Sequence, residues 1–573
     1  VEDTARLRDA LGVPAPMGVP AAFLAEVADP VGDLVHRYAR THGPFTVAAA
    51  AAHLGLGPAV VRDTLARLAG ERIVVEGDFL PETSPAPETF PSASRERSTQ
   101  WCHAEVLGAL RRGSLAAGRA EIEPVDAATL ARFTLAWQHV DPGERLTGVD
   151  GVAVVLDQLA GYPLPASAWE SLILPARVSD YRPAMLDELL AAGEIVWSGA
   201  GRIGAADGWI RFCPSDLADV LLPAADAIDV TEVHRVLLER FTAAGGLRFA
   251  HLAAAFDDAG TAPSPPPPTE IEAAIWDLVW SGHLSNDTFA PVRALIAPRR
   301  SASSRSVPSR SVPSHRSRGR APRLRPARLS TRHLIAGTPA APAPPTASGR
   351  WFTLGARLDD PTVATSVRCD QLLARHGVVT RGAVGTENVP GGFARIYKAL
   401  SVFEDSGQAR RGYYVDGLGG AQFAATTTVD ELRRHTADPD GTRAPGNAVL
   451  LAATDPANPF GAALAWPDRP DAGGHRPGRK PGALVVLVDG DLALFVERGG
   501  KSVLTFTAAA AKLGAAATAL ADAVAAGGVS RLTIDQIDGV TALRSDLAPL
   551  LVEAGFATTP RGLRSHHGHH ARG

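Results

Sequence analysis

The stretch that decides the fold of this 573-residue chain is residues 367–424, VRCDQLLARHGVVTRGAVGTENVPGGFARIYKALSVFEDSGQARRGYYVDGLGGAQFA. Its apolar residues first recur with helical spacing and then form two strand-like runs around the turn Gly417-Leu418-Gly419-Gly420. The predicted elements are helices at 367–376, 380–386 and 391–405 and strands at 408–415 and 420–424. Three helices followed by a hairpin is the order of a winged helix, whose third helix can enter the major groove of DNA.

The same order of helix, glycine turn and short strand recurs upstream. In the first copy the helices are expected at 33–42, 46–53 and 60–68 and the strand at 72–77. Thr46 is the expected N-cap of the second of these helices. Two further copies are centred on residues 184–197 and 271–286. Such modules either bind DNA or only pack against one another, and the sequence leaves both alternatives open for each copy.

Length and composition predict several domains. A single hydrophobic core stops growing near ~250–300 residues, and this chain has 573. The net charge of −4 predicts no general attraction to polyanions, but residues 298–350 are rich in Ser, Pro and Arg and contain no Asp or Glu. This stretch is predicted to be a disordered basic linker. The cysteines lie far apart and form neither a CxxC metal motif nor a disulfide framework.

We therefore predict a mainly α protein with β elements, in which tandem winged-helix modules precede a β-barrel-like mixed domain. The barrel rests on strands expected at 446–454 and 482–506, with a hairpin turn at Asp489-Gly490-Asp491. The expected boundaries are 1–80 for winged helix 1, 81–98 for a linker, 99–148 for a winged-helix-like module 2, 149–222 for winged helix 3, 223–297 for winged helix 4, 298–350 for the basic linker, 351–440 for winged helix 5, 441–564 for the barrel-like domain and 565–573 for a disordered tail.

Basic and aromatic side chains on the third helices, on the second helix of the last module, on the last wing and in the C-terminal domain are the candidate DNA-binding residues. They would neutralise phosphates and stack on an unpaired base, or else form the solvated face of each module. The candidates are Arg62, Arg67, Arg381, Arg395, Lys398, Arg410, Arg411, Tyr413, Arg479 and Lys480.

Little in the sequence indicates catalysis. No GxxxxGK[ST] phosphate loop occurs, so this chain by itself is not expected to hydrolyse ATP, and no metal site is predicted. The histidines near the C-terminus, from His566 to His570, lie in a Gly-rich end. Asp455, in the polar loop at 454–461, is the candidate catalytic carboxylate, because such a group can activate water or stabilise a cation at a sugar carbon. The alternative is a structural Asx turn.

Longer strings in the chain resemble a known family. They are ARVSDYRPAMLDEL at 176–189 with GEIVW at 193–197, RHGVVTRGA at 375–383, VPGGF at 389–393, RRGY at 410–413 with GLG at 417–419 and AQF at 421–423, and HRPGRK at 475–480. On these strings the chain is similar, from about residue 29 to residue 564, to the C-terminal region of the large helicase-related (Lhr) superfamily-2 DNA helicases.

The resemblance implies an ATPase motor upstream of Val1, so ATP and Mg are expected only there and no cofactor is expected in this chain. It also implies tandem winged helices, a β-barrel, a homo-oligomer and an architecture similar to AlkZ-type DNA glycosylases. Some members' C-terminal regions are associated with uracil excision. Residues 159–165, LAGYPLP, stand where AlkZ-type enzymes carry glutamines, so this sequence departs from their catalytic pattern.

The leading interpretation is a DNA-binding region of a bacterial DNA-repair helicase, which holds single- or double-stranded DNA for the upstream motor. The first alternative is a monofunctional DNA glycosylase acting on uracil-type bases through Asp455. The second is a non-catalytic oligomerisation module. We expect a fragment of a longer cytoplasmic protein, because the sequence begins at Val1 and shows neither a signal peptide nor a membrane span.

Overall fold

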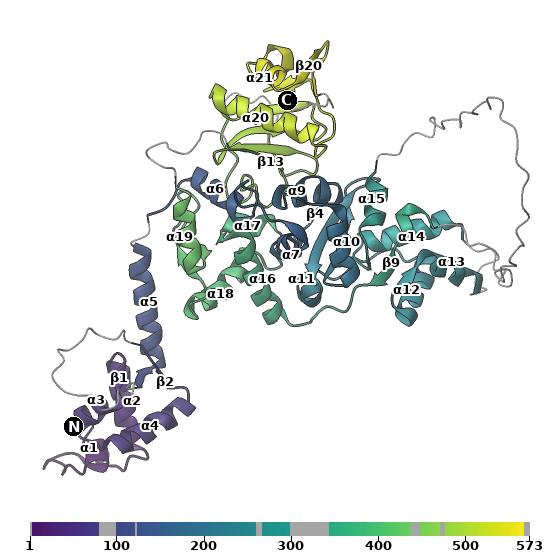
Figure 1. Cartoon of the computed structure of the whole chain (residues 1–573). Coiled ribbons are helices and arrows are strands. Elements are labelled where there is room, and N and C mark those ends of the chain that lie inside the picture. Colours follow the sequence, from purple (N-terminus) through teal and green to yellow (C-terminus); the bar gives the residue numbers. More distant parts are fainter. Residues whose placement is uncertain are drawn as a thin grey trace, which may run out of the picture. The chain divides into compact units, whose positions relative to one another are not determined.

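The computed structural model describes residues 3–79, 99–120, 123–258, 266–297, 343–436, 447–469 and 476–565. The chain divides into two units, Val1–Glu123 with Ser401–Tyr413 and Pro124–Leu400 with Tyr414–Gly573 (Figure 1). The predicted linker at 81–98 and nearly all of the predicted basic linker and tail lie outside the described residues. No helix in the described part of the chain is long and apolar enough to span a membrane.

The first unit contains a small helical bundle with an antiparallel sheet. Its elements are α1 (Thr4–Leu11), α2 (Pro30–Thr41), β1 (Phe45–Thr46), α3 (Val47–Leu54), α4 (Pro58–Gly70), β2 (Val74–Gly77), β3 (Gln100–His103) and α5 (Ala104–Ala120). Thr46 caps α3 as predicted, because its side chain accepts the N–H of Ala49. Strand β3 pairs between β1 and β2, so this sheet includes residues beyond the predicted boundary at residue 80. Trp101 of β3 packs into the core of α2, α3 and α4.

The second unit begins with helices followed by a long hairpin. The elements are α6 (Ala127–Trp137), α7 (Gly148–Gln158), β4 (Leu164–Pro165), α8 (Ala166–Ala168), a π-helical turn at Trp169–Ile173, α9 (Leu174–Arg177), α10 (Pro183–Ala192), β5 (Ile195–Arg202) and β6 (Gly208–Pro214). The strands form an antiparallel sheet in the order β4-β6-β5. Three helices, α6, α7 and α10, therefore precede a wing-like hairpin, as in a winged helix.

The next segment repeats this order and shares its core with the preceding one. The elements are α11 (Ala218–Leu221), α12 (Glu232–Ala244), β7 (Leu247–Arg248), α13 (Phe249–Asp258), α14 (Pro268–Trp280), β8 (Leu284–Asn286), α15 (Ala290–Ile296) and β9 (Arg350–Thr353). Strand β9 lies between β7 and β8, so residues beyond 343 complete this sheet. Trp351 of β9 contacts Trp197 of β5 and Trp276 of α14, which joins both segments into one apolar core.

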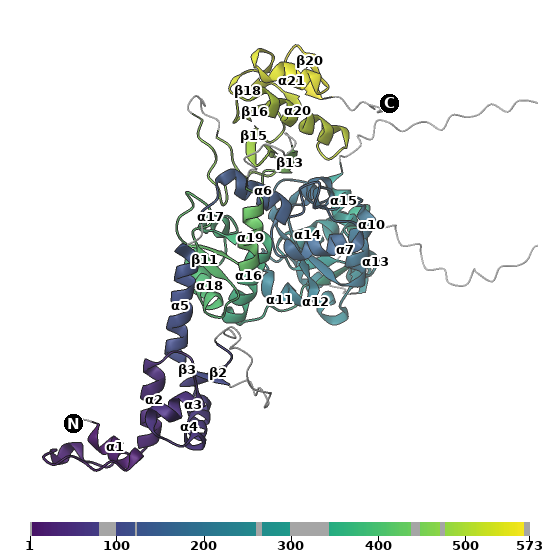
Figure 2. The ribbon, with the colours of Figure 1, turned by 60° about the vertical axis from the view of Figure 1, so that its left-hand side comes forward.

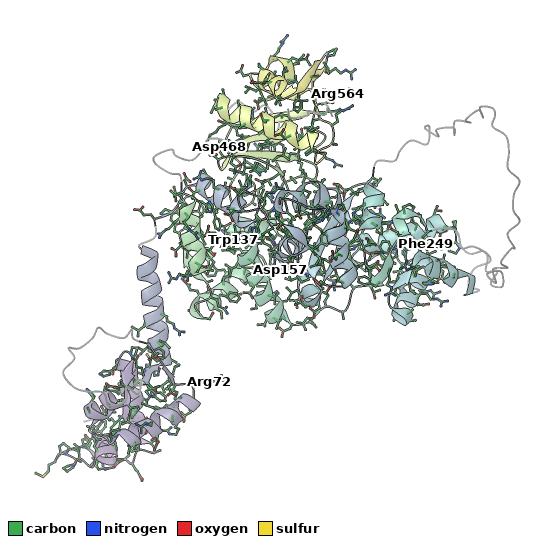
Figure 3. The ribbon with its side chains drawn as sticks, in the orientation of Figure 1. Arg72, Trp137, Asp157, Phe249, Asp468 and Arg564 are labelled. Atoms are coloured by element: carbon green, nitrogen blue, oxygen red, sulfur yellow. The ribbon has the colours of Figure 1, made fainter. Side chains whose placement is uncertain are left out.

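The stretch quoted first folds in the predicted order. The elements are α16 (Pro361–His376), β10 (Val378–Val379), α17 (Arg381–Thr386), α18 (Gly392–Asp405), β11 (Arg410–Gly412), β12 (Gln422–Ala424) and α19 (Thr426–Arg434). Helix α16 lies against α7, and α19 lies against α6 (Figure 2). The indole N–H of Trp137, labelled in Figure 3, donates to the Ala374 carbonyl at 2.8 Å. Gln371 donates to the Asp157 carbonyl at 2.7 Å, so hydrogen bonds join α16 to both α6 and α7.

The C-terminal domain contains an open sheet rather than the predicted barrel. Its strands run in the order β13 (Ala448–Ala452), β14 (Leu484–Val488), β15 (Asp491–Val496), β16 (Ser502–Thr505), β18 (Gln536–Ile537) and β19 (Val540–Thr541). Among the described residues β13 and β19 are the two edges and do not pair. Closure requires tilted and staggered strands around a full circle, and the last two strands here have two residues each.

Helix α20 (Ala510–Ala525) covers this sheet (Figure 1). A second small sheet of β17 (Thr533–Ile534), β21 (Gly562–Ser565) and β20 (Phe556–Thr559), with α21 (Leu547–Glu553), completes the domain. The predicted hairpin turn is confirmed, because Asp489 and Gly490 have φ angles of 54° and 88° between β14 and β15. Two successive positive φ angles are the mark of a tight turn that matches the twist of its strands.

Candidate nucleic-acid interface

The polar loop after β13 is held by its own side chains. One carboxylate oxygen of Asp455 accepts the N–H of Ala457 at 2.8 Å, which is the Asx turn considered from the sequence. Asn458 donates from Nδ2 to the Ala453 carbonyl at 3.0 Å and accepts the N–H of Phe460 at 3.1 Å. Both side chains are buried, so the loop is a rigid element rather than a flexible connection.

Asp455 forms a buried ion pair with Arg177, at the end of α9. The two guanidinium nitrogens Nη1 and Nη2 lie 3.0 and 2.6 Å from the two carboxylate oxygens, and the side chains are 0% and 1% exposed. Gln138, following α6, accepts from Nη2 of Arg177 at 2.8 Å. Because both carboxylate oxygens of Asp455 are engaged and buried, neither is open to a ligand in this conformation. A catalytic role for Asp455 stays a prediction.

Arg479 lies over the same loop. Its guanidinium donates to the carbonyls of Asn458 at 2.7 Å, Asp455 at 3.0 Å and Thr454 at 3.1 Å. The Tyr162 hydroxyl donates to the Thr454 carbonyl at 3.3 Å. Carbonyl oxygens that turn outward from an irregular loop need donors, and Arg479 supplies most of them. Of the two sequence candidates here, Arg479 therefore stabilises the loop by hydrogen bonds, while its neighbour Lys480 is exposed.

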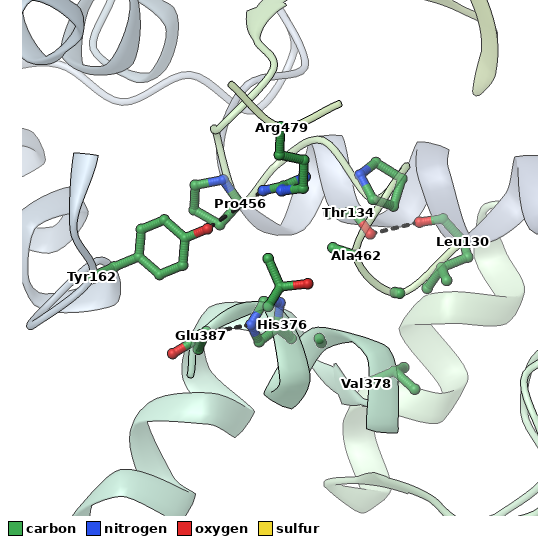
Figure 4. A pocket seen from close by; sticks show the side chains of 13 residues that line it. Leu130, Thr134, Tyr162, His376, Val378, Glu387, Pro456, Ala462 and Arg479 are labelled. Atoms are coloured by element: carbon green, nitrogen blue, oxygen red, sulfur yellow. Dashed lines mark hydrogen bonds and ion pairs between the residues drawn. The ribbon is translucent and has the colours of Figure 1, made fainter. Parts of the chain in front are cut away.

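A hollow lies between this loop and the α16–α17 turn (Figure 4). Tyr162 and Arg479 stand on one side of it, and His376 and Glu387 stand on the other. The remaining wall comes from Leu130 and Thr134 of α6 and from the loop prolines Pro456 and Pro459. Most of the lining is apolar, with a few polar groups that converge on the opening, which is the usual make-up of a small-molecule or base pocket.

A second hollow continues from the first past Tyr162. Its polar lining comes from Arg211 of β6, Asn388, Thr454 and Arg479, with the Trp209 indole beside them. Tyr162, Glu387 and Arg479 line both hollows. The combined site offers an aromatic face, amide and hydroxyl groups, and a carboxylate.

Glu387 is the ionised group of this site. Burial alone would raise its pKa, but Arg375, 2.5 Å away, and His376, 2.6 Å away, lower the pKa to about 2. Arg375 also donates to the Ala160 carbonyl at 2.6 Å and lies over the Tyr162 ring, 5.1 Å from its centroid. The carboxylate therefore orients the basic side chains that in turn support Tyr162.

The third helices of the winged-helix segments differ in charge. Among the described residues α10 carries Asp187 and Glu188, and α14 carries Glu270, Glu272 and Asp277; neither helix contains a Lys or Arg. Asp187 is also occupied, because its carboxylate accepts from Arg293 at 2.5 Å and from the Thr288 hydroxyl at 2.7 Å. These two helices therefore present no cationic face to a phosphate backbone.

Basic side chains do lie on α4 and on the α17–α18 pair. Arg62 and Lys398 are exposed and form no ion pair within the described part of the chain. Arg381, at the start of α17, is also exposed and lies over the Phe393 ring at 5.9 Å. Arg67 is exposed but shared between Asp29 at 2.5 Å and Glu71 at 3.1 Å.

The remaining sequence candidates have different positions. Arg395 turns inward, donating to the Thr365 hydroxyl at 2.8 Å and the Pro361 carbonyl at 2.7 Å, so it does not lie on the outer face of α18. In the wing, Arg410 and Tyr413 are exposed, and Arg411 lies 3.6 Å from Glu404.

Sequence reasoning missed the polar residues at the centre of the site. Arg177 and Glu387 fall inside strings that look like ordinary helix and turn sequence, and their partners are distant in the chain. Tyr162 lies in the segment that departs from the AlkZ-type pattern, which was a usable signal. No group of three or more His, Cys, Asp or Glu side chains in the described residues is arranged to hold a metal.

The fold and these charges define a multi-domain protein of the winged-helix class. Family models described as winged-helix domains of the large helicase-related protein match residues 125–215 and 358–444. Over 98% of its length the chain is 49% identical to an Lhr helicase/probable uracil glycosylase of Mycolicibacterium smegmatis, of which it covers 36%. Over the same share it is 35% identical to an Lhr helicase/uracil glycosylase of Escherichia coli, of which it covers 35%.

The chain therefore belongs to the Lhr family and fits the C-terminal, winged-helix region of these helicases. It spans about a third of the length of these relatives. The phosphate loop of an ATPase motor does not occur in the sequence.

The buried pair gives the first prediction. Asp455→Ala leaves Arg177 buried without its carboxylate and should destabilise the protein by about 3–5 kcal/mol, while a double variant with Arg177→Met should lose much less than the sum of the two single effects. Tryptophan-monitored chemical unfolding measures these differences. The exposed Asp468→Ala is the matched control, expected within about 0.5 kcal/mol of the parent chain. Equal unfolding midpoints for Asp455→Ala and Asp468→Ala would contradict the stabilising role.

The second prediction concerns pH. Because the folded-state pKa of Glu387 is about 2 and its ordinary value is 4.5, its ionisation contributes stability that is complete above about pH 4.5 and is lost as the pH falls toward about 2. Glu387→Gln should therefore have a lower melting midpoint than the parent at neutral pH, and the gap should narrow between pH 4.5 and pH 2. A gap that stays constant over this range would show that Arg375 and His376 do not stabilise the carboxylate.

Proposed function

We propose that this region holds DNA for the motor of an Lhr-family helicase, and that the winged helices of α4 and α18 make the main contacts. The observation that carries the proposal is the contrast between the third helices, of which only α4 and α18 present cations to solvent. Phosphate contacts from Lys and Arg supply most non-specific affinity for DNA. The acidic helices α10 and α14 instead serve packing between the modules.

The names of the relatives support the helicase part of the proposal, since both are named Lhr helicase. The matched winged-helix models support the DNA-binding part. The expected homo-oligomer stays a prediction.

Salt-dependent binding tests the DNA-holding role. The double variant Arg381→Ala/Lys398→Ala should bind duplex DNA more weakly for every sequence, and the slope of log affinity against log salt should become shallower by about 2, because two phosphate contacts are lost. Fluorescence anisotropy with a labelled duplex at several salt concentrations measures both quantities.

Arg235→Ala is the control, because Arg235 is an exposed α12 arginine already paired with Glu232 and Glu239. A control variant that weakens binding as much as the double variant would show that general charge, rather than the α17–α18 face, holds the DNA. Affinity that does not change with salt would reject the DNA-holding role altogether.

A second candidate function is excision of uracil from DNA. It is favoured by the hollows beside Tyr162, where an extruded base would meet an aromatic ring, the Asn388 amide and the Glu387 carboxylate. Glu387 lines the hollow and Asp455 does not. Both oxygens of Glu387 are paired with Arg375 and His376, so one of these pairs would open for the carboxylate to orient water or to stabilise positive charge at the sugar carbon. The relatives' names include uracil glycosylase.

An excision assay separates the two carboxylates. The chain is incubated without ATP with end-labelled single-stranded DNA that carries one uracil, and alkali then reveals the abasic site. Glu387→Gln should abolish the uracil-specific break, whereas Asp455→Asn, which keeps an acceptor for Arg177, should retain it. Both variants need a melting curve that shows a folded protein.

Loss of the break in a folded Asp455→Asn, with retention in Glu387→Gln, would restore Asp455 as the catalytic carboxylate. A parent chain that binds the strand but leaves it intact would reject excision and leave the DNA-holding proposal standing.

A further inference from the structure

A third hollow lies between the β4-β6-β5 sheet and helices α16 and α18. Four arginines line it: Arg211 of β6, Arg357 before α16, Arg368 of α16 and Arg395 of α18. We call this set the arginine cleft. Of these four, only Arg395 was predicted from the sequence to bind DNA, and there it was expected on the outer face of α18.

Three of the four guanidinium groups of the arginine cleft, those of Arg357, Arg368 and Arg395, are held by neutral acceptors. Arg368 donates to the Leu221 carbonyl at 3.0 Å, and Arg357 donates to the carbonyls of Pro223 at 2.9 Å and Gly355 at 3.0 Å. Arg395 donates to a hydroxyl and a carbonyl, as described above. Among the described residues, no carboxylate lies within ion-pair distance of any of the four. Arg357, Arg368 and Arg395 are therefore fixed in place, and the carboxylates of Asp219, Asp226 and Glu387 act on the cleft only from beyond ion-pair distance.

The acidic residues of the lining do not change this balance. They are Asp219 and Glu387. Glu387 is already paired with Arg375 and His376. Asp219 forms no ion pair within the described part of the chain, so the lining keeps a net positive charge.

Such an arrangement is costly unless an anion completes it. Burial, and the neighbouring charge of Arg368, lower the pKa of Arg211, and burial also lowers the pKa of Arg368. Gathering partly desolvated like charges destabilises a fold. Arginine is the residue whose planar, multi-donor group best matches a phosphate oxygen pair. A bound phosphate would offset both the desolvation and the mutual repulsion.

We propose that the arginine cleft binds a backbone phosphate of a nucleic-acid strand. The proposal rests on the DNA-holding function above and adds a site to it. Arg211, Asn388 and Glu387 line both the arginine cleft and the hollows beside Tyr162. A strand whose phosphate contacts Arg211 and Arg368 would thus pass next to the hollow that receives a base, with Arg211 shared between the two.

The test compares Arg211→Gln, Arg368→Gln and the double variant with the parent chain, using a labelled oligothymidylate at several salt concentrations. Each substitution should lower the affinity about tenfold, the loss expected for a charged hydrogen bond, and make the salt slope shallower by about 0.7. The melting midpoint without ligand should not fall for Arg211→Gln, because a repulsive charge is removed. Arg202→Gln is the control, because Arg202 is exposed and paired with Asp277. This variant should change neither the affinity nor the salt slope.

Arg211→Lys provides a second variant in case the glutamine variants fail to fold. It should keep the salt slope and show an affinity between those of the parent and Arg211→Gln, because the charge remains and the forked geometry is lost.

Three outcomes overturn the inference. Strand affinity and salt slope that are unchanged in Arg211→Gln and Arg368→Gln, while Arg381→Ala/Lys398→Ala weakens binding, would remove the arginine cleft and leave the DNA-holding function intact. If inorganic phosphate instead raises the melting midpoint of the parent but not of these variants, and strand binding is unaffected, the cleft is a site for a free anion. A parent chain that binds no DNA rejects the DNA-holding function itself, and the strand assignment with it.

Discussion

The buried pair between Arg177 and Asp455 is the constraint on which the second unit depends. It joins residues separated by 278 positions, one at the end of α9 and the other in the loop after β13. Each charge would be costly to bury alone, so each of these two side chains requires the other to be in place. Gln138 and the Ala457 N–H take up further hydrogen bonds of the pair. The C-terminal sheet is thereby fixed to the first winged helix of this unit, and its loop becomes a wall of the hollows beside Tyr162.

A second polar centre, around Glu387, holds the opposite wall of the hollow in place. Arg375 reaches from Glu387 to the Ala160 carbonyl and to the Tyr162 ring, so the position of that ring depends on α16 as well as on its own segment. Both walls are thus held by buried ion pairs. Arg375 also donates to the Ala160 carbonyl and Arg177 to the Ile173 carbonyl, while Nε of Arg177 has no hydrogen-bond partner in the described part of the chain. Networks of this kind restrict the geometry strongly, because a partly satisfied buried charge is costly. A pre-formed hollow follows from the same interactions that join the domains.

Much of the fold could be predicted from local sequence, and the site could not. The helices and hairpin of residues 367–424, the Thr46 cap and the turn at Asp489-Gly490 are determined by local periodicity and φ preferences. Strands β3 and β9 complete sheets from beyond a predicted linker, and short strands give no periodic signal that would reveal such pairing. The predicted barrel failed because closure depends on strand length and tilt. Tyr162 and Glu387 meet through tertiary packing, and Arg395 turns inward because Thr365 and Pro361 offer acceptors there.

The repeated modules show why a shared fold does not imply a shared role. Helix α10 occupies the position of a third helix, but its Asp187 forms an ion pair with Arg293, which also pairs with Glu170 at 2.6 Å. That face is committed to packing within the chain, and its acidic groups would repel a phosphate backbone. Helix α18 buries Ile396 and Leu400 and leaves Lys398 outside. Since the packing requirement falls on one face of each helix, the opposite face is free to differ in charge, and that charge decides which modules can contact DNA.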